Sequence, residues 1–415
     1  MNTKKLKIGL FGFGCVGHGL YEVLQQTPGL DAEIKTIVVK QKNKSRRLAP
    51  EWFSYDKSEI LNDAEINLVV ELIDDPDAAF EIVKQALCNG KAVVSANKKM
   101  IAEHFEELLE LQKQFQTPFL YEAAVCASIP IIRNLEEYYD NDLLRSIEGI
   151  VNGSTNYILS KTASENLSYQ QALQQAQELG YAESNPRLDT GGFDAKFKLL
   201  LLIAHAFGIV LQPEQIFHQG INKLGELELN YAREKGLKIK LKARAFKNEA
   251  GKVCAFVLPE FVSKNDKFYQ VDEVYNALQI EGCFADKQFF VGRGAGAYPT
   301  ASAVLSDISA LRYNYRYEYK KRQEDNEMEA SENIFLRVLL RHPREASDEV
   351  RSKFLDTEEL YKNKEQAYTI GIITLAELQS TLTTEDVSAV LMDLPNSAEV
   401  SQYSEKFGEI AWLQE

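Results

Sequence analysis

A short apolar run at residues 6–11 leads directly into Gly12-Phe13-Gly14-Cys15-Val16-Gly17. This Gly-x-Gly-x-x-Gly spacing, between a strand and a helix, is typical of a turn that binds the pyrophosphate of a dinucleotide. The first glycine permits the tight turn, the second lets the backbone approach the phosphates, and the third lets helix and strand pack closely. We therefore expect cofactor-binding residues at Gly12, Gly14, Cys15, Val16 and Gly17, with a purely structural glycine-rich turn as the alternative.

The pattern that follows the glycine loop alternates between strand-like and helical segments up to about residue 150. Strand-like runs lie at residues 6–11, 34–39, 68–73, 92–96 and 119–121, with helical stretches between them. Strands that alternate with helices predict a parallel sheet covered on both faces. The expected fold class is α/β, with an N-terminal Rossmann-type dinucleotide-binding domain followed by α+β regions.

Composition excludes several classes of protein. The chain has 415 residues and a formal net charge of −14, so as a whole it would repel nucleic acid and anionic membranes. No run approaches the ~18 apolar residues of a membrane span. Five dispersed cysteines without metal-ligand spacing indicate reduced thiols, and we expect a cytoplasmic protein with no nucleic-acid or membrane partner.

Cations follow the second predicted strand, where an acid would bind the ribose hydroxyl of NAD. They precede the first acid, Glu51, and are Lys40, Lys42, Lys44, Arg46 and Arg47. A 2′-phosphate is a reason to place cations there, which favours NADP(H) and leaves NAD(H) possible. Lys40 is included in the predicted cofactor site, but the sequence does not say which of these cations makes the contact, and a solvated basic loop is the alternative.

Residues 176–198 form the segment richest in candidate catalytic and substrate-binding residues. A helix is expected to end at Gly180, and a new helix to start near Asp194. Asp194 and Lys198 would then share one helix face at i, i+4, and Asp189 lies just before that helix. Taken alone, such a pair is more often a surface ion pair.

The whole segment resembles the signature of homoserine dehydrogenases. Thr190 departs from it, standing where an aliphatic residue is usual, and the matching positions are Ala176, Gly180, Tyr181, Ala182, Asn185, Pro186, Asp189, Gly192, Asp194 and Lys198. Segments 95–99, 121–130, 151–159 and 294–304 also resemble the family, in the expected order. The resemblance covers about residues 5–315. Another departure is Asp74-Asp75, where the family usually has Gly-Gly.

The resemblance implies reversible hydride transfer that interconverts L-aspartate 4-semialdehyde and L-homoserine, in threonine and methionine biosynthesis. Negative charge builds on the aldehyde oxygen during this transfer, which requires a waiting cation or proton donor. Lys198 and Lys98 suit that task, and Asp194 would orient Lys198. The substrate-binding candidates are Asp189, Glu183, Tyr181, Gly153 and Ser154, and Lys98 and Gly294 join the cofactor site.

The resemblance further implies a monovalent cation, Na⁺ or K⁺, and a homodimer. Glu122 and the backbone carbonyls of Val125, Ala127 and Ile129 would hold the cation, since oxygen ligands suit a hard ion. The predicted domains are a dinucleotide-binding domain (1–135, resumed at 292–318), a catalytic and dimerisation domain (136–291), a linker (319–332) and a C-terminal module (333–415).

The C-terminal module is expected to be a degenerate ACT-like α+β unit. Its predicted order is strand (334–340), helix (345–355), strand (367–373), helix (384–388) and strand (389–392). The family's Asp-x-Pro-Gly turn is replaced by Arg341-His342-Pro343-Arg344-Glu345-Ala346, without the glycine that would let a bound amino acid approach. Our hypothesis is that the module packs or pairs subunits but does not sense threonine.

Two other functions fit parts of the sequence. An acylating semialdehyde dehydrogenase would use a cysteine nucleophile such as Cys126, but no histidine motif accompanies it. A non-catalytic NADP-binding regulator would fit Asp74-Asp75 and the unusual C-terminal module. The intact Lys98, Asp189, Asp194 and Lys198 argue against the regulator.

Overall fold

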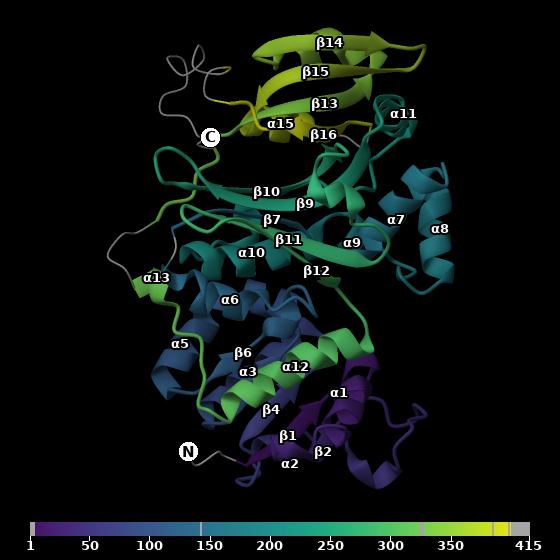
Figure 1. The fold of residues 1–415 in the computed structure, drawn as a ribbon. Helices are drawn as coiled ribbons and strands as arrows, with labels where there is room; N and C mark the ends of the chain where they lie inside the picture. Colours follow the sequence, from purple (N-terminus) through teal and green to yellow (C-terminus); the bar gives the residue numbers. More distant parts are fainter. Residues whose placement is uncertain (1–4, 142, 324–327, 384–385, 397–398, 400–415) are drawn as a thin grey trace. The chain divides into compact units, whose positions relative to one another are not determined.

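The computed structural model describes residues 5–141, 143–323, 328–383, 386–396 and 399. The chain divides into two compact units (Figure 1). The first unit comprises residues 1–140 and 292–320, and the second comprises residues 141–291 and 321–415. The predicted 333–415 segment therefore belongs to the same unit as residues 141–291, and its residues 400–415 lie outside the described residues.

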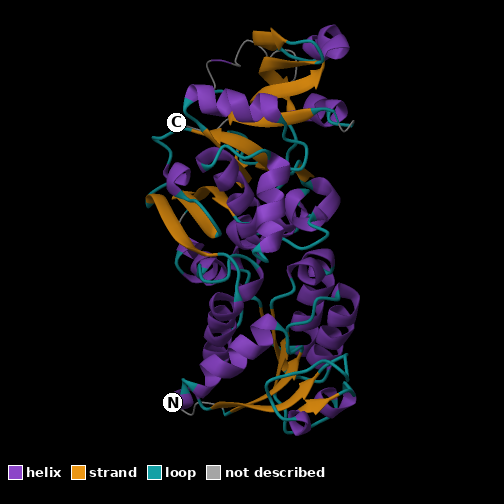
Figure 2. Cartoon of the chain, turned by 90° about the vertical axis from the view of Figure 1, so that its right-hand side faces the viewer, coloured by secondary structure: helices purple, strands orange, loops and turns teal. Residues whose placement is uncertain are grey.

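The first unit is built on a parallel sheet in the order β3-β2-β1-β4-β5-β6. The strands are β1 (Leu6–Phe11), β2 (Ala32–Val38), β3 (Phe53–Ser54), β4 (Leu68–Glu71), β5 (Ala92–Ser95) and β6 (Phe119–Leu120). All residues of β4 and β5 are buried, because helices pack against this sheet (Figure 2). The strand order reverses between β1 and β4, which is the doubly wound arrangement and confirms the predicted α/β class.

The helices of the first unit are α1 (Cys15–Gln25), α2 (Ser58–Leu61), α3 (Pro76–Cys88), α4 (Lys98–Glu103), α5 (Phe105–Phe115), α6 (Ile131–Glu137) and α12 (Ala297–Leu311). Along the chain, α1 to α5 lie between strands of this sheet, and α6 and α12 follow its last strand. Helix α12 returns from late in the chain and lies alongside α1 (Figure 1). A Cβ atom on Gly19 would come within 2.7 Å of the Ala297 carbonyl oxygen, so the two helices approach closely only because this residue is glycine.

The second unit contains a larger sheet in the order β12-β11-β7-β9-β10-β16-β13-β15-β14, with β8 beside β10. The strands are β7 (Leu144–Ile150), β8 (Phe217–His218), β9 (Lys238–Lys247), β10 (Val253–Val262), β11 (Tyr275–Gly282), β12 (Asp286–Arg293), β13 (Phe335–Pro343), β14 (Asp356–Lys362), β15 (Gln366–Thr374) and β16 (Ser388–Asp393). β10 pairs in parallel with β8 and β16, and antiparallel with β9.

The helices of the second unit are α7 (Gly153–Ser164), α8 (Tyr169–Glu178), α9 (Arg187–Thr190), α10 (Phe193–Phe207), α11 (Glu226–Lys235), α14 (Ser347–Ser352) and α15 (Leu375–Thr381); α13 (Lys320–Gln323) spans the boundary between the units. Helix α10 is buried at every residue from Asp194 to Phe207. A helix buried all round brings its few charged residues against protein groups rather than solvent. No helix of the described residues is both long and apolar enough to cross a membrane.

The C-terminal segment has the element order βαββαβ, from β13 to β16. The predicted strands correspond to β13, β15 and β16. The helix predicted at 345–355 corresponds to α14, which is shorter. Strand β14 was missed because this edge strand is mostly exposed and polar, without an apolar alternation. The predicted helix at 384–388 is wrong in its described part, since α15 lies earlier and β16 begins at Ser388; residues 384–385 lie outside the described residues.

The C-terminal strands share one hydrophobic core with the rest of the second unit. Side chains of β9 and β10 and side chains of β13 and β16 pack into the same cluster, among them Phe246, Phe256, Leu258, Leu336, Val338 and Leu391. In the predicted linker, Glu329 and Ser331 hydrogen-bond the backbone of Val253 at 2.8 and 2.9 Å. The segment is thus part of this unit's sheet and core.

Candidate active site

The glycine loop has the geometry that a dinucleotide needs. Gly12 has φ of +91°, and a Cβ atom there would come within 2.5 Å of the Leu72 carbonyl oxygen. A Cβ atom on Gly17 would come within 2.5 Å of the Gly12 carbonyl oxygen, whereas the space at Gly14 is open. Glycine is therefore required at the two crowded positions, and the backbone at Gly14 is accessible to a phosphate at the start of α1.

A cavity of about 830 Å³ opens beside this loop, bordered by the ends of β2 and β4. Among the residues that line it are Lys40, Lys44, Arg46, Asp74 and Asp75. Lys40 Nζ lies 3.8 Å from Asp75 Oδ2, but the Lys40 side chain is 91% exposed, so this ion pair is weak. Arg46 is better fixed, because it donates to the carbonyls of Lys44 at 2.9 Å and Gln41 at 2.7 Å.

Glu71, a buried carboxyl group that was not predicted as a site residue, lies at the carboxyl end of β4 in the first sheet. Glu71 Oε2 accepts a hydrogen bond from Ser95 Oγ at 2.6 Å, and Oε1 accepts one from the Ile73 amide at 2.7 Å. Burial raises the pKa of Glu71 to about 7. The next turn is fixed by Asn97, which donates to the Ile73 carbonyl and caps α4, the helix that begins at Lys98. A glutamate that ends an apolar strand is the signal in the sequence.

Four polar side chains meet in the second unit. Asn152 Nδ2 donates to Asp189 Oδ1 at 2.7 Å and to Asp194 Oδ2 at 2.8 Å. Lys198 Nζ lies 2.8 Å from the same Asp194 oxygen and donates to the Val151 carbonyl at 2.7 Å. The side chains of Asp194 and Lys198 are only 4% and 8% exposed, so this is a buried, charged network.

Two helix starts position this network. Gly192, with φ of +85°, precedes α10 and sets the point from which Asp194 and Lys198 face the same side. Asn152 is the N-cap of α7, and its Oδ1 accepts the Thr155 amide at 2.8 Å. The predicted i, i+4 pairing is confirmed. Asn152 was not among the predicted site residues, although an asparagine before Gly153 at a helix start is a recognisable cap.

The remaining substrate candidates lie on α7 and on the loop after α8. Ser154 Oγ donates to the Tyr181 carbonyl at 2.6 Å, and the Tyr181 ring packs 4.8 Å from that of Tyr157. A Cβ atom on Gly153 would come within 2.8 Å of the Val274 carbonyl oxygen, so that position is tightly enclosed. Glu183 is exposed. Its backbone carbonyl accepts a hydrogen bond from Gln177 Nε2 at 2.9 Å, and among the described residues no hydrogen bond to its carboxylate is seen. The structure thus links Ser154 with Tyr181 but leaves Glu183 outside this network.

The predicted cation site lies around a buried carboxylate in the first unit. Glu122 Oε1 and Oε2 accept the amides of Ile132 and Arg133 at the start of α6, both at 2.9 Å. Burial raises the pKa of Glu122 above its ordinary value. Ala127 has φ of +43°, in the turn that carries the predicted carbonyl ligands. Among the described residues, no cluster of three or more His, Cys, Asp or Glu side chains is arranged to hold a metal ion.

Two further features have no place in the proposed chemistry. Cys126 is fully buried, which does not suit a nucleophile that must reach a substrate.

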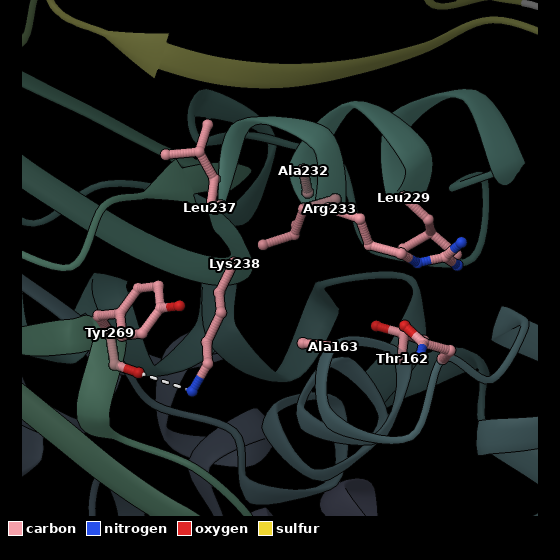
Figure 3. Close-up of a pocket in the computed structure, with 11 residues that line it drawn as sticks. Thr162, Ala163, Leu229, Ala232, Arg233, Leu237, Lys238 and Tyr269 are labelled. Atoms are coloured by element: carbon pink, nitrogen blue, oxygen red, sulfur yellow. Dashed lines mark hydrogen bonds between the residues drawn. The ribbon is translucent and has the colours of Figure 1, made fainter.

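A hollow of about 300 Å³ lies between α7 and α11, where Lys238 donates to the Tyr269 carbonyl at 3.0 Å (Figure 3). It adjoins Thr162 and Ala163, at the opposite end of α7 from Asn152, so we assign it no part in the site.

Comparisons with known proteins agree with this geometry. The family model described as "Homoserine dehydrogenase, NAD binding domain" matches residues 12–122, and the one described as "Homoserine dehydrogenase" matches residues 130–309. A homoserine dehydrogenase of Helicobacter pylori is 39% identical over 312 residues, which cover 74% of this chain and 73% of that protein. One from Lactococcus lactis is 34% identical over 343 residues, covering 80% and 78%.

Solved structures extend the likeness into the C-terminal segment. A homoserine dehydrogenase from Thiobacillus denitrificans superposes with a TM-score of 0.83 at 27% identity, covering 94% of this chain and 98% of that one. A hyperthermophilic archaeal homoserine dehydrogenase in complex with NADPH has a TM-score of 0.64 at 27% identity, covering 76% and 99%. The chain therefore belongs to the homoserine dehydrogenases, oxidoreductases that act on the CH–OH group of homoserine.

Proposed function

We propose that the chain interconverts L-homoserine and L-aspartate 4-semialdehyde with NADP(H), and that Lys198 stabilises the reacting oxygen. The observation that carries this proposal is that the Lys198 ammonium is buried and held by two hydrogen-bonding partners. Among the described residues, Asp194 and the Val151 carbonyl are its two polar partners, at 2.8 and 2.7 Å. An ammonium has three N–H groups, so one remains for a substrate oxygen. A fixed, buried cation stabilises charge on that oxygen better than a solvated one.

The neighbouring side chains have distinct roles in this proposal. Asp194 holds Lys198 in position, and Asn152 holds Asp194 and Asp189 together. Asp189 is the carboxylate for the substrate's α-ammonium group, and Gly153, Ser154, Tyr181 and Glu183 remain proposed substrate contacts. When bound, the nicotinamide supplies or accepts the hydride. The proposed setting of the reaction is threonine and methionine biosynthesis, in the cytoplasm.

The first unit would hold the dinucleotide. The open backbone at Gly14 and the crowding at Gly12 and Gly17 fit a pyrophosphate at the start of α1, and Cys15, Val16 and Gly294 are proposed to complete the site. NADP(H) is favoured because the cavity is lined by Lys40, Lys44 and Arg46. Lys98 is the first residue of α4, at the same carboxyl edge of the sheet, and is proposed as a second cation for the reacting groups.

Two further proposals concern an ion and the assembly. Glu122 and the carbonyls of Val125, Ala127 and Ile129 would hold Na⁺ or K⁺, since these donors are all oxygen atoms. The second proposal is a homodimer formed through the central region, where the apolar strands of 239–291 suit contact between subunits. Light scattering at micromolar concentration tests the dimer, and a monomer would contradict it.

Nicotinamide absorbance tests the main proposal. Purified protein is supplied with L-homoserine and either NADP⁺ or NAD⁺, and kcat/KM is compared between them. We expect turnover, with the higher kcat/KM for NADP⁺. A higher value for NAD⁺ would overturn the cofactor preference, and no turnover with either would favour the non-catalytic regulator.

A further inference from the structure

Gln219 forms hydrogen bonds to the backbones of both β16 and β10, like a residue in a paired strand. Its Nε2 donates to the Ala389 carbonyl at 2.8 Å, and its Oε1 accepts the Ala389 amide at 2.9 Å. Its own amide donates to the Val257 carbonyl of β10 at 2.9 Å. Gln219 is buried, so replacing its side chain would leave both backbone groups of Ala389 without these partners.

The residues directly after Gln219 hold the end of α9. The amides of Ile221 and Asn222 both donate to the Thr190 carbonyl, at 2.7 and 3.2 Å. A Cβ atom on Gly220 would come within 2.0 Å of the same carbonyl oxygen, so only glycine fits there. Segment 219–222 therefore lies directly against the end of α9 and cannot shift without moving Thr190.

Thr190 follows Asp189, the carboxylate that accepts Asn152 Nδ2 at 2.7 Å. The path from β16 to this carboxylate thus consists of the Ala389–Gln219 hydrogen bonds, two peptide steps, the Ile221–Thr190 hydrogen bond and one further peptide bond. We infer that Gln219 is a positioning residue for the substrate site, which fixes Asp189 through segment 219–222 with β16 as its anchor. This inference rests on the proposed role of Asp189.

A second anchor holds the following residues of the same segment. Arg341 of β13 donates to the Lys223 carbonyl at 2.7 Å and to Glu228 Oε1 at 2.9 Å. Glu228 in turn accepts the Gly225 amide at 3.2 Å. Residues 219–225 are therefore held by two neighbouring strands of the C-terminal segment. That segment supports the substrate site even without binding an effector.

The test compares Gln219→Ala and Gln219→Met in the full chain. Methionine fills most of the volume but forms neither hydrogen bond, so both variants should raise KM for homoserine about tenfold while KM for NADP⁺ stays unchanged. The matched control is Gln279→Ala, since Gln279 donates to Glu148 at 2.8 Å in the same unit but lies outside segment 219–225. An unchanged KM for homoserine in both Gln219 variants would overturn the inference, as would an equal rise in the control.

Hydrogen exchange provides a measurement that does not depend on activity. Faster exchange of the Ile221 and Asn222 amides in Gln219→Met than in wild type supports the inference, and unchanged exchange overturns it. If a variant fails to fold, Gln219→Glu replaces it, because glutamate keeps the acceptor for the Ala389 amide but cannot donate to the Ala389 carbonyl when ionised. Failure of the proposed function would be distinct, because the wild type itself would then not turn over homoserine.

Discussion

Asp194 and Lys198 lie one turn apart on α10 and form a buried ion pair of 2.8 Å. A pair at this spacing is ordinarily a surface feature worth a few tenths of a kcal/mol. A buried pair is different, because removing two charges from water costs stability unless other groups form hydrogen bonds with them. Here Asn152 and the Val151 carbonyl supply those contacts. These contacts hold the Lys198 ammonium in the position that its proposed role at the reacting oxygen requires.

Lys198→Ala should lower kcat by about 10² to 10³, since it removes the cation that we propose stabilises the reacting oxygen. The measurement is steady-state nicotinamide absorbance with homoserine and NADP⁺. Lys196→Ala is the matched control, because Lys196 is also buried on α10 but packs over the Phe193 ring, 5.3 Å from its centroid. Near wild-type turnover in Lys198→Ala would remove this lysine from the mechanism.

Asn152→Ala should raise KM for homoserine and lower kcat, each by about tenfold, because Asp189 and Asp194 lose the donor that holds them together. The variant also loses a helix cap, which costs about 1 kcal/mol of stability. Ser168→Ala separates the two effects, since Ser168 caps α8 and its side-chain hydrogen bond within the described part of the chain is to Gln171. If Ser168→Ala impaired the kinetics equally, the loss would reflect capping and not the site.

The sequence predicted the parts of the site that depend on nearby residues. The glycine loop and the Asp194–Lys198 face follow from spacing alone, because helix periodicity and the turn preferences of glycine act over a few positions. The contact between Asn152 and Asp189 joins two helix ends 37 residues apart, and that between Gln219 and Ala389 spans 170 residues. Such contacts depend on how helices and strands far apart in the sequence pack together, which no local pattern encodes. β14 was missed for a local reason, since most of its side chains are exposed and polar.

Asp75→Asn should raise kcat/KM for NADP⁺ about threefold and leave that for NAD⁺ nearly unchanged. The carboxylate lies 3.8 Å from Lys40 Nζ and would repel a 2′-phosphate, but both groups are exposed, so the effect is small. Asparagine still caps α3, where Asp75 Oδ1 accepts the Ala78 amide at 3.2 Å. Asp77→Asn is the control in the same helix turn. An equal change in kcat/KM for NADP⁺ and NAD⁺ would show that Asp75 does not contribute to the discrimination between the two cofactors.

Threonine should not inhibit the enzyme at millimolar concentration. In the turn after β13, the Arg344 amide donates to the Glu365 carbonyl at 3.1 Å, and the Arg344 carbonyl accepts Ser347 Oγ at 2.6 Å. These backbone groups are already paired, and no glycine opens the turn to a bound amino acid. The measurement is initial rate against threonine concentration. Saturable inhibition would show that an effector site exists after all.

Glu71→Gln should change how stability depends on pH. Burial raises the pKa of Glu71 from its ordinary value of 4.5 to about 7, so between these values the folded state binds a proton that the unfolded state has lost. The wild type therefore loses stability as pH rises through this window, by up to about 3 kcal/mol, and loses no more from this group above it.

Glutamine cannot ionise, yet it can accept the Ile73 amide and donate to Ser95 Oγ. The melting temperature of Glu71→Gln relative to wild type should therefore rise between pH 4.5 and pH 7 and then level off. Glu59→Gln, at an exposed position of the same unit, controls for the loss of any carboxylate. A constant difference in melting temperature across this range would mean that Glu71 is already ionised at the lower pH, and that its two hydrogen bonds outweigh the cost of burial.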